Sequence, residues 1–267
     1  MKKERIDVLL VERGIVDSRE KAKKLVMAGV VLVDNERVDK PGTKIDVESE
    51  IRLKGGNPLK YVSRGGLKLE KAIESFDIEL KGKVALDIGA STGGFSDCML
   101  QNGVEKVYAI DVGYGQLDWK IRSDERVVAM DRTNIRNVTK EDVGELADFV
   151  SIDVSFISLK LVLPVAKELT KEDAEIVALI KPQFEAGKDK VGKKGVVRDR
   201  KVHEEVVRSI YEFSKGIGLY FRGMTYSPVK GAEGNIEYLA YISKNEEGCI
   251  DIDSLLEKVV ESSHENL

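Results

Sequence analysis

Charged residues stand at the ends of four short apolar runs in the middle of the chain. Three of the runs end in an aspartate and the fourth in a lysine, at Asp111, Asp131, Asp153 and Lys181. Apolar runs that alternate with helical segments predict the strands of a parallel sheet, in which ligands bind beyond the carboxyl ends of the strands. We therefore expect these four side chains to surround one polar ligand site.

A glycine-rich turn precedes this series. Val84–Ile88 predicts a buried strand, residues 89–94 read Gly-Ala-Ser-Thr-Gly-Gly, and residues 95–100 have helical spacing. Glycines let the backbone approach a ligand, and the start of the helix offers unpaired N–H groups. The turn is typical of a nucleotide-cofactor corner. A dinucleotide-binding fold also has a glycine-rich turn, followed about 20 residues later by an acidic residue, and Asp111 stands at that position. However, Ser91 takes the place of the second glycine in the G-x-G-x-x-G motif of such folds.

The elements that must position these residues alternate regularly, which predicts an α/β fold with a parallel sheet covered on both faces. A closing amphipathic helix is expected within residues 246–267, because apolar residues recur there at helical spacing. Helical segments are predicted at 67–73, 95–100, 158–168 and 202–214, and strands at 84–88, 106–112, 126–131, 149–153, 176–182, 219–227 and 236–243.

The first 54 residues predict a separate small α+β domain. Helices are expected at 5–13 and, after a Ser18 cap, up to Gly29, and strands at 30–33, at 37–38 and within 45–53. Residues 54–58, Lys-Gly-Gly-Asn-Pro, have the composition of a linker. The expected organisation is a domain at 1–54, a linker at 55–60 and a larger domain at 61–267.

Composition narrows the class of protein. Residues 1–60 hold 14 Lys and Arg against 11 Asp and Glu, whereas the whole chain carries a net charge of −4, so a basic head precedes an acidic body. Such a head favours contact with a polyanion. The sequence has neither a membrane-length apolar run nor a signal-peptide core, and Cys98 and Cys249 lack metal-site spacing. We expect a cytoplasmic protein with no membrane partner and no metal.

The first domain resembles the S4 RNA-binding domain. The resemblance lies in Arg5-Ile6-Asp7, Ser18-Arg19 with Ala22, residues 28–33, Lys40-Pro41 and Ile51. It implies that basic side chains lie along an RNA backbone, which gives affinity with little sequence readout. The expected RNA-binding residues of this domain are Arg5, Arg19, Lys21, Lys23 and Lys24.

The larger domain resembles the Rossmann-like class I methyltransferases that use S-adenosyl-L-methionine. The resemblance lies in the strand-end aspartates and in the final pair of strands. It implies that Asp111 binds the ribose hydroxyls, that residues 89–94 approach the methionine moiety, and that Asp131 and Arg132 border the adenine. The expected cofactor-binding residues are Asp87, Gly89, Ser91, Thr92, Gly93, Gly94, Phe95, Asp111, Val112, Asp131, Arg132 and Asp153.

The sequence also bears on which atom would be methylated. Asp153-Val154-Ser155-Phe156 lacks both prolines of the motif typical of amino-nitrogen methyltransferases, and neither cysteine stands where carbon-5 pyrimidine methylation needs a nucleophile. The remaining polar set resembles the Lys-Asp-Lys-Glu tetrad of FtsJ-type ribose 2′-O-methyltransferases. The matching residues, in chain order, are Lys68, Asp153, Lys181 and Glu237.

Methylation of a ribose 2′-hydroxyl requires charged side chains of this kind. A 2′-hydroxyl is a poor nucleophile, and a lysine can take its proton only if burial or a neighbouring cation destabilises the ammonium form. Lys181, after an apolar strand, is the expected base. Lys68 would destabilise its ammonium form and orient the ribose, while Asp153 and Glu237 would hold the two lysines in place.

An S4 head joined to an FtsJ-like body resembles the TlyA family of ribosomal RNA 2′-O-methyltransferases, also called hemolysin A. The matching stretches are 61–66, 87–95, 153–157 and 180–185. The resemblance implies methylation of cytidine riboses in 16S or 23S ribosomal RNA, with ribosomal subunits as partners. Residues 183–200 predict a mobile loop, and further RNA contacts are expected at Arg64, Lys193, Lys194 and Arg198.

Two other hypotheses stay open. The hemolysin label suggests a membrane-active protein, although the sequence offers no strongly basic amphipathic segment. A nicotinamide-dependent oxidoreductase would share the same glycine-rich corner.

Overall fold

The structure is a computed structural model that describes residues 3–13, 15–16, 18–47, 49–54, 60–231 and 234–267. The chain divides into two units, residues 1–60 and residues 61–267, which are described separately below. Of the predicted linker at 55–60, only Lys60 lies within the described residues.

The described residues of the first unit form two helices and two small sheets, which pack around their own apolar core. Ser18 caps the second helix by accepting a hydrogen bond from the Lys21 amide, as the sequence predicts. Asp34 and Asn35 both adopt positive φ, which a two-residue hairpin turn requires. The elements are β1 (Lys3–Arg5), α1 (Ile6–Glu12), α2 (Arg19–Met27), β2 (Val31–Val33), β3 (Glu36–Val38), β4 (Lys44–Asp46) and β5 (Ile51–Leu53).

The strands of this unit differ from the prediction at two places. The sequence predicts one strand within residues 45–53, but a turn in which Ser49 donates to the Asp46 carbonyl divides the segment. β5 joins β2 and β3 in a three-stranded sheet, whereas β4 pairs with β1, a strand that the sequence analysis does not predict. Three-residue strands carry too little alternation of apolar and polar residues to be read from sequence.

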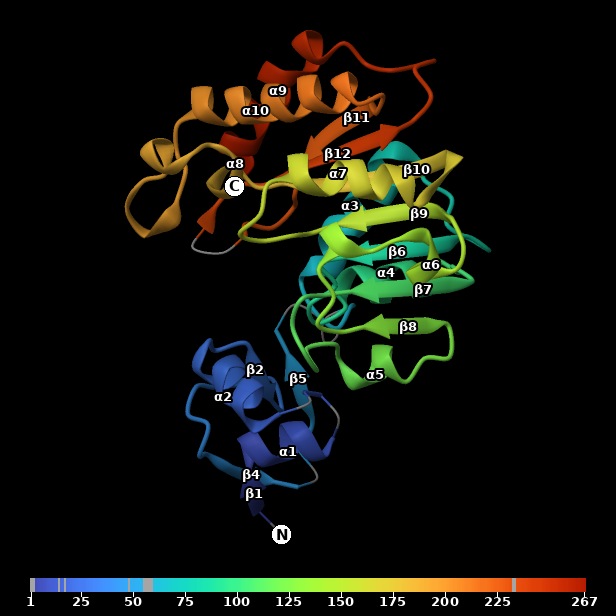
Figure 1. Cartoon of the computed structure of the whole chain (residues 1–267). Coiled ribbons are helices and arrows are strands. Elements are labelled where there is room, and N and C mark those ends of the chain that lie inside the picture. Colours follow the sequence, from blue (N-terminus) through green and yellow to red (C-terminus); the bar gives the residue numbers. More distant parts are fainter. Residues whose placement is uncertain (1–2, 14, 17, 48, 55–59, 232–233) are drawn as a thin grey trace. The chain divides into compact units, whose positions relative to one another are not determined.

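The described residues of the second unit form a seven-stranded sheet and the helices that pack around it (Figure 1). They are α3 (Gly65–Phe76), β6 (Val84–Ile88), α4 (Gly94–Gln101), β7 (Lys106–Ile110), α5 (Trp119–Arg122), β8 (Val127–Met130), α6 (Lys140–Val143), β9 (Ala147–Ile152), α7 (Leu159–Glu168), β10 (Thr170–Ile180), α8 (Pro182–Glu185), α9 (Arg200–Gly216), β11 (Tyr220–Tyr226), β12 (Tyr238–Ser243) and α10 (Ile252–Asn266).

The strands of this sheet run in the order β11-β12-β10-β9-β6-β7-β8. Strands β6 to β10 pair in parallel, so that their carboxyl ends share one edge. β12 enters between β10 and β11 and is antiparallel to both. The amino end of β12 therefore meets the carboxyl end of β10, and the ligand-binding edge gains a residue from the start of a strand.

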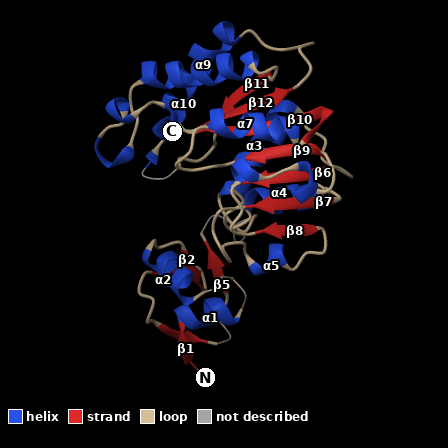
Figure 2. Cartoon of the chain, viewed as in Figure 1, coloured by secondary structure: helices blue, strands red, loops and turns tan. Residues whose placement is uncertain are grey.

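Helices cover both faces of the sheet (Figure 2). Apolar residues of α3 and α4 pack with β6 and β7 in one core, which includes the buried Leu69, Phe95 and Met99. Residues of α7, α9 and α10 form a second core with β9 to β12. Burial on both faces explains why the strands read as continuous apolar runs.

Candidate active site

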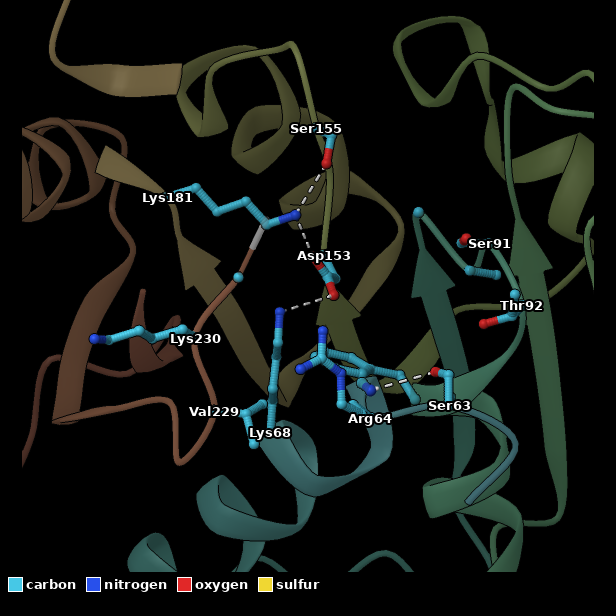
Figure 3. Close-up of a pocket in the computed structure, with 16 residues that line it drawn as sticks. Ser63, Arg64, Lys68, Ser91, Thr92, Asp153, Ser155, Lys181, Val229 and Lys230 are labelled. Atoms are coloured by element: carbon cyan, nitrogen blue, oxygen red, sulfur yellow. Dashed lines mark hydrogen bonds and ion pairs between the residues drawn. The ribbon is translucent and has the colours of Figure 1, made fainter. Parts of the chain in front are cut away.

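Four charged side chains predicted to act together converge at the carboxyl edge of the large sheet. The Lys68 Nζ lies 2.6 Å from the Glu237 Oε2 and 3.8 Å from the Asp153 Oδ2. The Lys181 Nζ lies 2.5 Å from the Asp153 Oδ1. Figure 3 shows Lys68 and Lys181 reaching Asp153 from different elements. The four residues thus form one chain of alternating charge, from Glu237 through Lys68 and Asp153 to Lys181.

The sheet register explains why residues so far apart in the sequence meet. Asp153 directly follows β9, and Lys181 directly follows β10, the parallel neighbour of β9. Glu237 directly precedes β12, whose first residue, Tyr238, pairs with Ile180. Lys68 comes from the first turns of α3, which packs over the β11–β12 side of the sheet.

This cluster is largely removed from water. Lys68 and Lys181 are each 8% exposed and Glu237 is 2% exposed. Charges in such a position are stable only when they are paired, and here each cation has a carboxylate within ion-pair distance. Lys181 also donates a hydrogen bond to the Ser155 Oγ at 3.0 Å. The contact between Lys181 and the Asp153 Oδ1 is an ion pair without hydrogen-bond geometry, and this oxygen has no hydrogen-bond partner among the described residues.

Two cavities open beside the cluster and share Gly89, Ser91, Asp153 and Ser155 in their walls. The first, of about 340 Å³, is bordered by Lys68 and Lys181, by the glycine turn, by residues 63–65 and by residues 229–231. The second, of about 370 Å³, lies between the ends of β6 and β7 and residues 133–135 and 153–157. A ligand that spans both cavities would reach the charged cluster with one end.

The glycine turn brings backbone against the cavity wall. A Cβ on Gly89 would stand 2.5 Å from the Asp153 carbonyl oxygen, and a Cβ on Gly94 would stand 2.2 Å from the Ser63 Oγ. Gly89 also has a φ of +86°. A side chain at either position would thus push the turn away from residues of the site. Gly89, Ser91, Thr92, Gly94 and Phe95 line the cavities, whereas Gly93 packs against Leu117 and Ile121.

The second cavity has apolar walls, and the Asp111 carboxylate stands at its rim on the side away from the charged cluster, which suits a nucleoside. Ile88 and Ile110 line it together with Val112, which is 72% exposed. Asp111 accepts hydrogen bonds from the amides of Ser91 and Gly113, at 2.8 and 2.7 Å, and these bonds fix its carboxylate at the rim. A fixed carboxylate beside an apolar slot fits a ribose diol next to a flat base.

The residues expected beside the base are placed differently from the prediction. Asp131 forms an ion pair with Arg122 at 2.5 Å, and the Arg132 guanidinium lies 4.3 Å from the centre of the Tyr114 ring. Neither lines the second cavity, whose wall is formed by Thr133, Asn134 and Ile135. Asp131 and Arg132 thus directly precede the three residues of the cavity wall.

Asp87 also has another position than the one expected. It is fully buried and accepts hydrogen bonds from Ser96 at 2.6 Å and Ser151 at 3.1 Å. Burial raises the pKa of its carboxyl group to about 6. Asp87 therefore links β6 to α4 and to β9, and it does not line either cavity.

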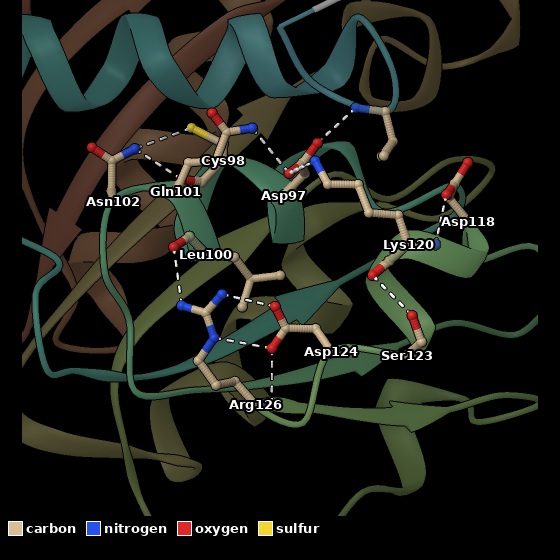
Figure 4. A network of polar contacts seen from close by, with 11 residues as sticks. Asp97, Cys98, Leu100, Gln101, Asn102, Asp118, Lys120, Ser123, Asp124 and Arg126 are labelled. Atoms are coloured by element: carbon tan, nitrogen blue, oxygen red, sulfur yellow. Dashed lines mark hydrogen bonds and ion pairs between the residues drawn. The ribbon is translucent and has the colours of Figure 1, made fainter. Parts of the chain in front are cut away.

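A second buried carboxylate fixes the helix that follows the turn. Asp97 is 1% exposed and accepts hydrogen bonds from the Val62 amide at 2.8 Å, from Gln101 at 3.0 Å and from Lys120 at 3.0 Å (Figure 4). It thereby ties α5 and the start of the second unit to α4. These contacts hold residues 63–65 against the first cavity.

Both units match known protein families. Residues 61–244 match the FtsJ-like methyltransferase model, which covers more than half of the chain, and residues 4–51 match the S4 domain model. The chain belongs to the FtsJ-like methyltransferase family.

Similar proteins match the chain over most of its length. A candidate rRNA methyltransferase of Bacillus subtilis, YqxC, is 52% identical over 100% of this chain and 96% of its own length. The 16S/23S rRNA (cytidine-2′-O)-methyltransferase TlyA of Mycobacterium tuberculosis is 42% identical over 89% of both chains. Among solved structures, a protein described as a hemolysin from Streptococcus thermophilus has a TM-score of 0.80 and 46% identity, and the match covers 100% of this chain and 97% of that one.

The basic residues predicted to bind RNA lie at three places in this family member. Arg64 borders the first cavity. Lys193, Lys194 and Arg198 line another cavity, of about 440 Å³, together with Lys190. The rest belong to the first unit, where Arg5 and Arg19 bind one carboxylate and Lys24 pairs with Glu20 at 3.6 Å, while Lys21 and Lys23 belong to α2.

Sequence reasoning missed several residues of the site. Ser155 binds Lys181, and Ser63 and Lys230 line the first cavity. Ser155 stands inside a stretch already singled out, two residues after Asp153, so its nearness to the tetrad was a usable signal. The loop between β11 and β12, which carries Lys230, gives no such signal before the strand order is known.

Among the described residues, no helix is long and apolar enough to cross a membrane. The described part of the chain also has no cluster of three or more His, Cys, Asp or Glu side chains that could hold a metal ion.

Proposed function

We propose that this chain transfers a methyl group from S-adenosyl-L-methionine to the ribose 2′-oxygen of a cytidine in ribosomal RNA. The observation that carries the proposal is the convergence of Lys68, Asp153, Lys181 and Glu237 beside the two cavities. The names of two relatives support the substrate, since both give an rRNA methyltransferase and one specifies cytidine 2′-O-methylation.

The residues present fit this cofactor. The apolar slot at Val112 and the carboxylate of Asp111 would hold the adenosine part, and the backbone at Gly89 and Ser91 would lie along the methionine part. The bound sulfonium supplies a methyl carbon that is already activated for attack by oxygen. What remains for the protein is to place the hydroxyl and to accept its proton.

Lys181 is the proposed proton acceptor. An uncharged Lys181 Nζ would accept the proton of the 2′-hydroxyl as that oxygen attacks the methyl group that the bound cofactor would supply. Asp153 and Ser155 hold the Nζ from two directions, at 2.5 and 3.0 Å. Lys68, which is paired with Glu237, contacts the other carboxylate oxygen of Asp153 and so helps to fix the side chain that holds Lys181.

RNA would be held by basic groups outside the cluster. We assign phosphate contacts to Lys193, Lys194 and Arg198, which share one cavity, and to the basic residues of the S4 unit. Contacts of this kind give affinity that depends on salt and carries little sequence information.

The decisive experiment is to map ribose methylation in ribosomal RNA by mass spectrometry after incubation with the protein and S-adenosyl-L-methionine. We expect a methylated cytidine with the wild-type chain and none with Lys181→Ala, while calorimetry shows the same cofactor affinity for both. Lys258→Ala, which removes an exposed lysine of α10, is the matched control and should keep full activity. Methylation by Lys181→Ala at the wild-type rate would refute the assignment of the base.

The same preparation separates the other two hypotheses. Calorimetric binding of NAD in place of S-adenosyl-L-methionine would favour an oxidoreductase. Leakage from liposomes at low protein concentration, together with unmodified RNA, would favour a membrane-active protein. Either result would overturn the proposed function.

A further inference from the structure

One buried carboxylate in the first unit binds two arginines that face solvent. Asp7, in the first turn of α1, is 0% exposed. Its Oδ1 accepts from the Arg5 Nε at 2.9 Å, and its Oδ2 accepts from the Arg5 Nη2 at 3.0 Å and the Arg19 Nη2 at 3.1 Å. The side chains of Arg5 and Arg19 are 41% and 56% exposed. The carboxylate is thus inside, and its two cationic partners are outside.

The backbone fixes this arrangement from three sides. Arg5 ends β1 and precedes α1, and Arg19 is the first residue of α2. The amide of Asp7 donates to the Pro41 carbonyl at 3.3 Å, which holds the start of α1 against the 40–43 turn. Gly42 lies directly under the Arg5 guanidinium, since a Cβ there would stand 3.7 Å from its Nη1. Asp7 therefore joins the ends of two elements and a turn.

Fold stability alone does not require two arginines at this carboxylate. The bidentate bond from Arg5 already compensates the buried charge and is the largest cause of the lowered Asp7 pKa, about 2. The second guanidinium leaves the group of three with one net positive charge. Both Nη2 atoms contact the same oxygen, so they lie at most about 6 Å apart.

Each guanidinium uses only some of its N–H donors to bind Asp7. A guanidinium has five N–H groups, of which Arg5 uses two here and Arg19 uses one. The planar fork matches phosphate geometry, and a guanidinium that is already fixed loses less side-chain entropy when it binds. Two such forks, held side by side at the surface, suit an anion with several acceptor oxygens.

We propose that Asp7 is a positioning residue that holds Arg5 and Arg19 as a preformed site for a backbone phosphate of RNA. The inference rests on the proposed function, because it assigns the RNA substrate of the same enzyme to this site. Asp7 itself does not touch the phosphate and acts through the two arginines.

The test uses the full-length protein and the variant Asp7→Asn, for which two explanations predict opposite signs. If only net charge matters, removing a carboxylate beside two arginines strengthens binding to RNA. If Asp7 orients the arginines, the loss of about one charge-assisted hydrogen bond to phosphate weakens binding roughly tenfold. We expect weaker binding, with a KM for ribosomal subunits roughly tenfold higher, an unchanged kcat and an unchanged affinity for S-adenosyl-L-methionine.

Glu12→Gln is the matched control. Glu12 is an exposed carboxylate at the other end of α1, so the variant makes the same change in net charge without touching the pair of arginines. It should leave the KM unchanged or lower it slightly. Asp7→Glu, which keeps the carboxylate, should recover part of the affinity, and Arg19→Lys, which keeps the charge but not the fork, should behave like Asp7→Asn.

Direct binding to purified ribosomal RNA, measured by fluorescence anisotropy without cofactor, separates this inference from the proposed function. Thermal melts of each variant correct the binding for the folded fraction. Equal or tighter binding by folded Asp7→Asn would overturn the inference even if the enzyme methylates RNA normally. Weaker binding by Asp7→Asn with no methylation by the wild-type chain would uphold the phosphate site and overturn the proposed reaction.

Discussion

The pairing of Lys68 with Glu237 allows a stability prediction that is tied to the site. The side chains are 11% and 2% exposed, and the Nζ and Oε2 atoms are 2.6 Å apart. Removing one partner of a buried pair costs about 3–5 kcal/mol, because it leaves a charge uncompensated. In Glu237→Gln, Lys68 keeps only the longer contact to Asp153, at 3.8 Å, so we expect a loss of about 3 kcal/mol.

That loss is large enough to measure in a domain of this size. For 150–250 residues, each kcal/mol shifts Tm by about 2–4 °C, so Glu237→Gln should unfold about 6–12 °C below the wild-type chain. Scanning calorimetry of the transition that belongs to residues 61–267 measures this shift, and urea unfolding gives the free energy independently.

The double variant Lys68→Met/Glu237→Gln decides whether the cause is the lost pairing. It removes both charges, and replacing a buried pair by uncharged residues of similar size is often neutral. We expect the double variant to recover most of the lost stability while it stays inactive. A double variant less stable than Glu237→Gln, or a single-variant loss below about 1 kcal/mol, would refute the reasoning from a buried pair.

Three further predictions follow from contacts around the site. Burial raises the pKa of Asp87 from 3.8 to about 6, so between these values the native state keeps a proton that the unfolded state loses, and the group lowers the free energy of unfolding by about 3 kcal/mol as the pH rises from 4 to above 6. In urea unfolding, Asp87→Asn should therefore be more stable than the wild-type chain at pH 8 but not at pH 4. An equal increase in stability at both pH values would contradict this reasoning. Glu185 accepts hydrogen bonds from the Ser158 Oγ at 2.6 Å and the Leu159 amide at 2.7 Å, and so links the segment after β9 to the segment after Lys181. Glu185→Gln should lower the free energy of unfolding in urea by about 1–2 kcal/mol and should lower kcat more than it raises KM. A change in KM alone would argue against a role for this link in placing Lys181. Replacing Lys193, Lys194 and Arg198 by alanine should reduce the slope of log affinity for RNA against log salt concentration by about 0.7 for each phosphate contact that is lost. A salt titration of RNA binding measures this slope, and an unchanged slope would show that these residues do not contact RNA.

The sequence predicted the convergence of Asp153 and Lys181 for a physical reason. Parallel strands end at the same edge, so residues that directly follow neighbouring strands must lie close together. Lys68 and Glu237 could be placed only by resemblance, because the position of Glu237 depends on β12 entering between β10 and β11 in the antiparallel direction. No local pattern in the sequence specifies that insertion.

The different surroundings of Asp87 and Asp111 follow from the geometry of a strand. Side chains of a strand alternate between its two faces, so a residue one position earlier points to the opposite side. Asp87 lies inside β6 and faces Ser96 and Ser151, whereas Asp111 lies one residue beyond β7 and reaches the cavity rim. The predicted bounds of β6 agree with the structure, but both faces of this strand are buried, so its apolar pattern does not tell which face carries Asp87.

The order of strands β11-β12-β10 also has a consequence for how the enzyme is made. A chain is synthesised from its amino end, and domains fold as their parts emerge. β11 emerges before β12 but borders only β12 in the sheet, so it has no strand to pair with until β12 arrives. Likewise, Lys68 cannot form its ion pair until Glu237 has been synthesised, 169 residues later in the chain. The charged cluster can therefore assemble only after nearly the whole chain has been translated, and a chain that stops before β12 would carry the cofactor turn without a complete active site.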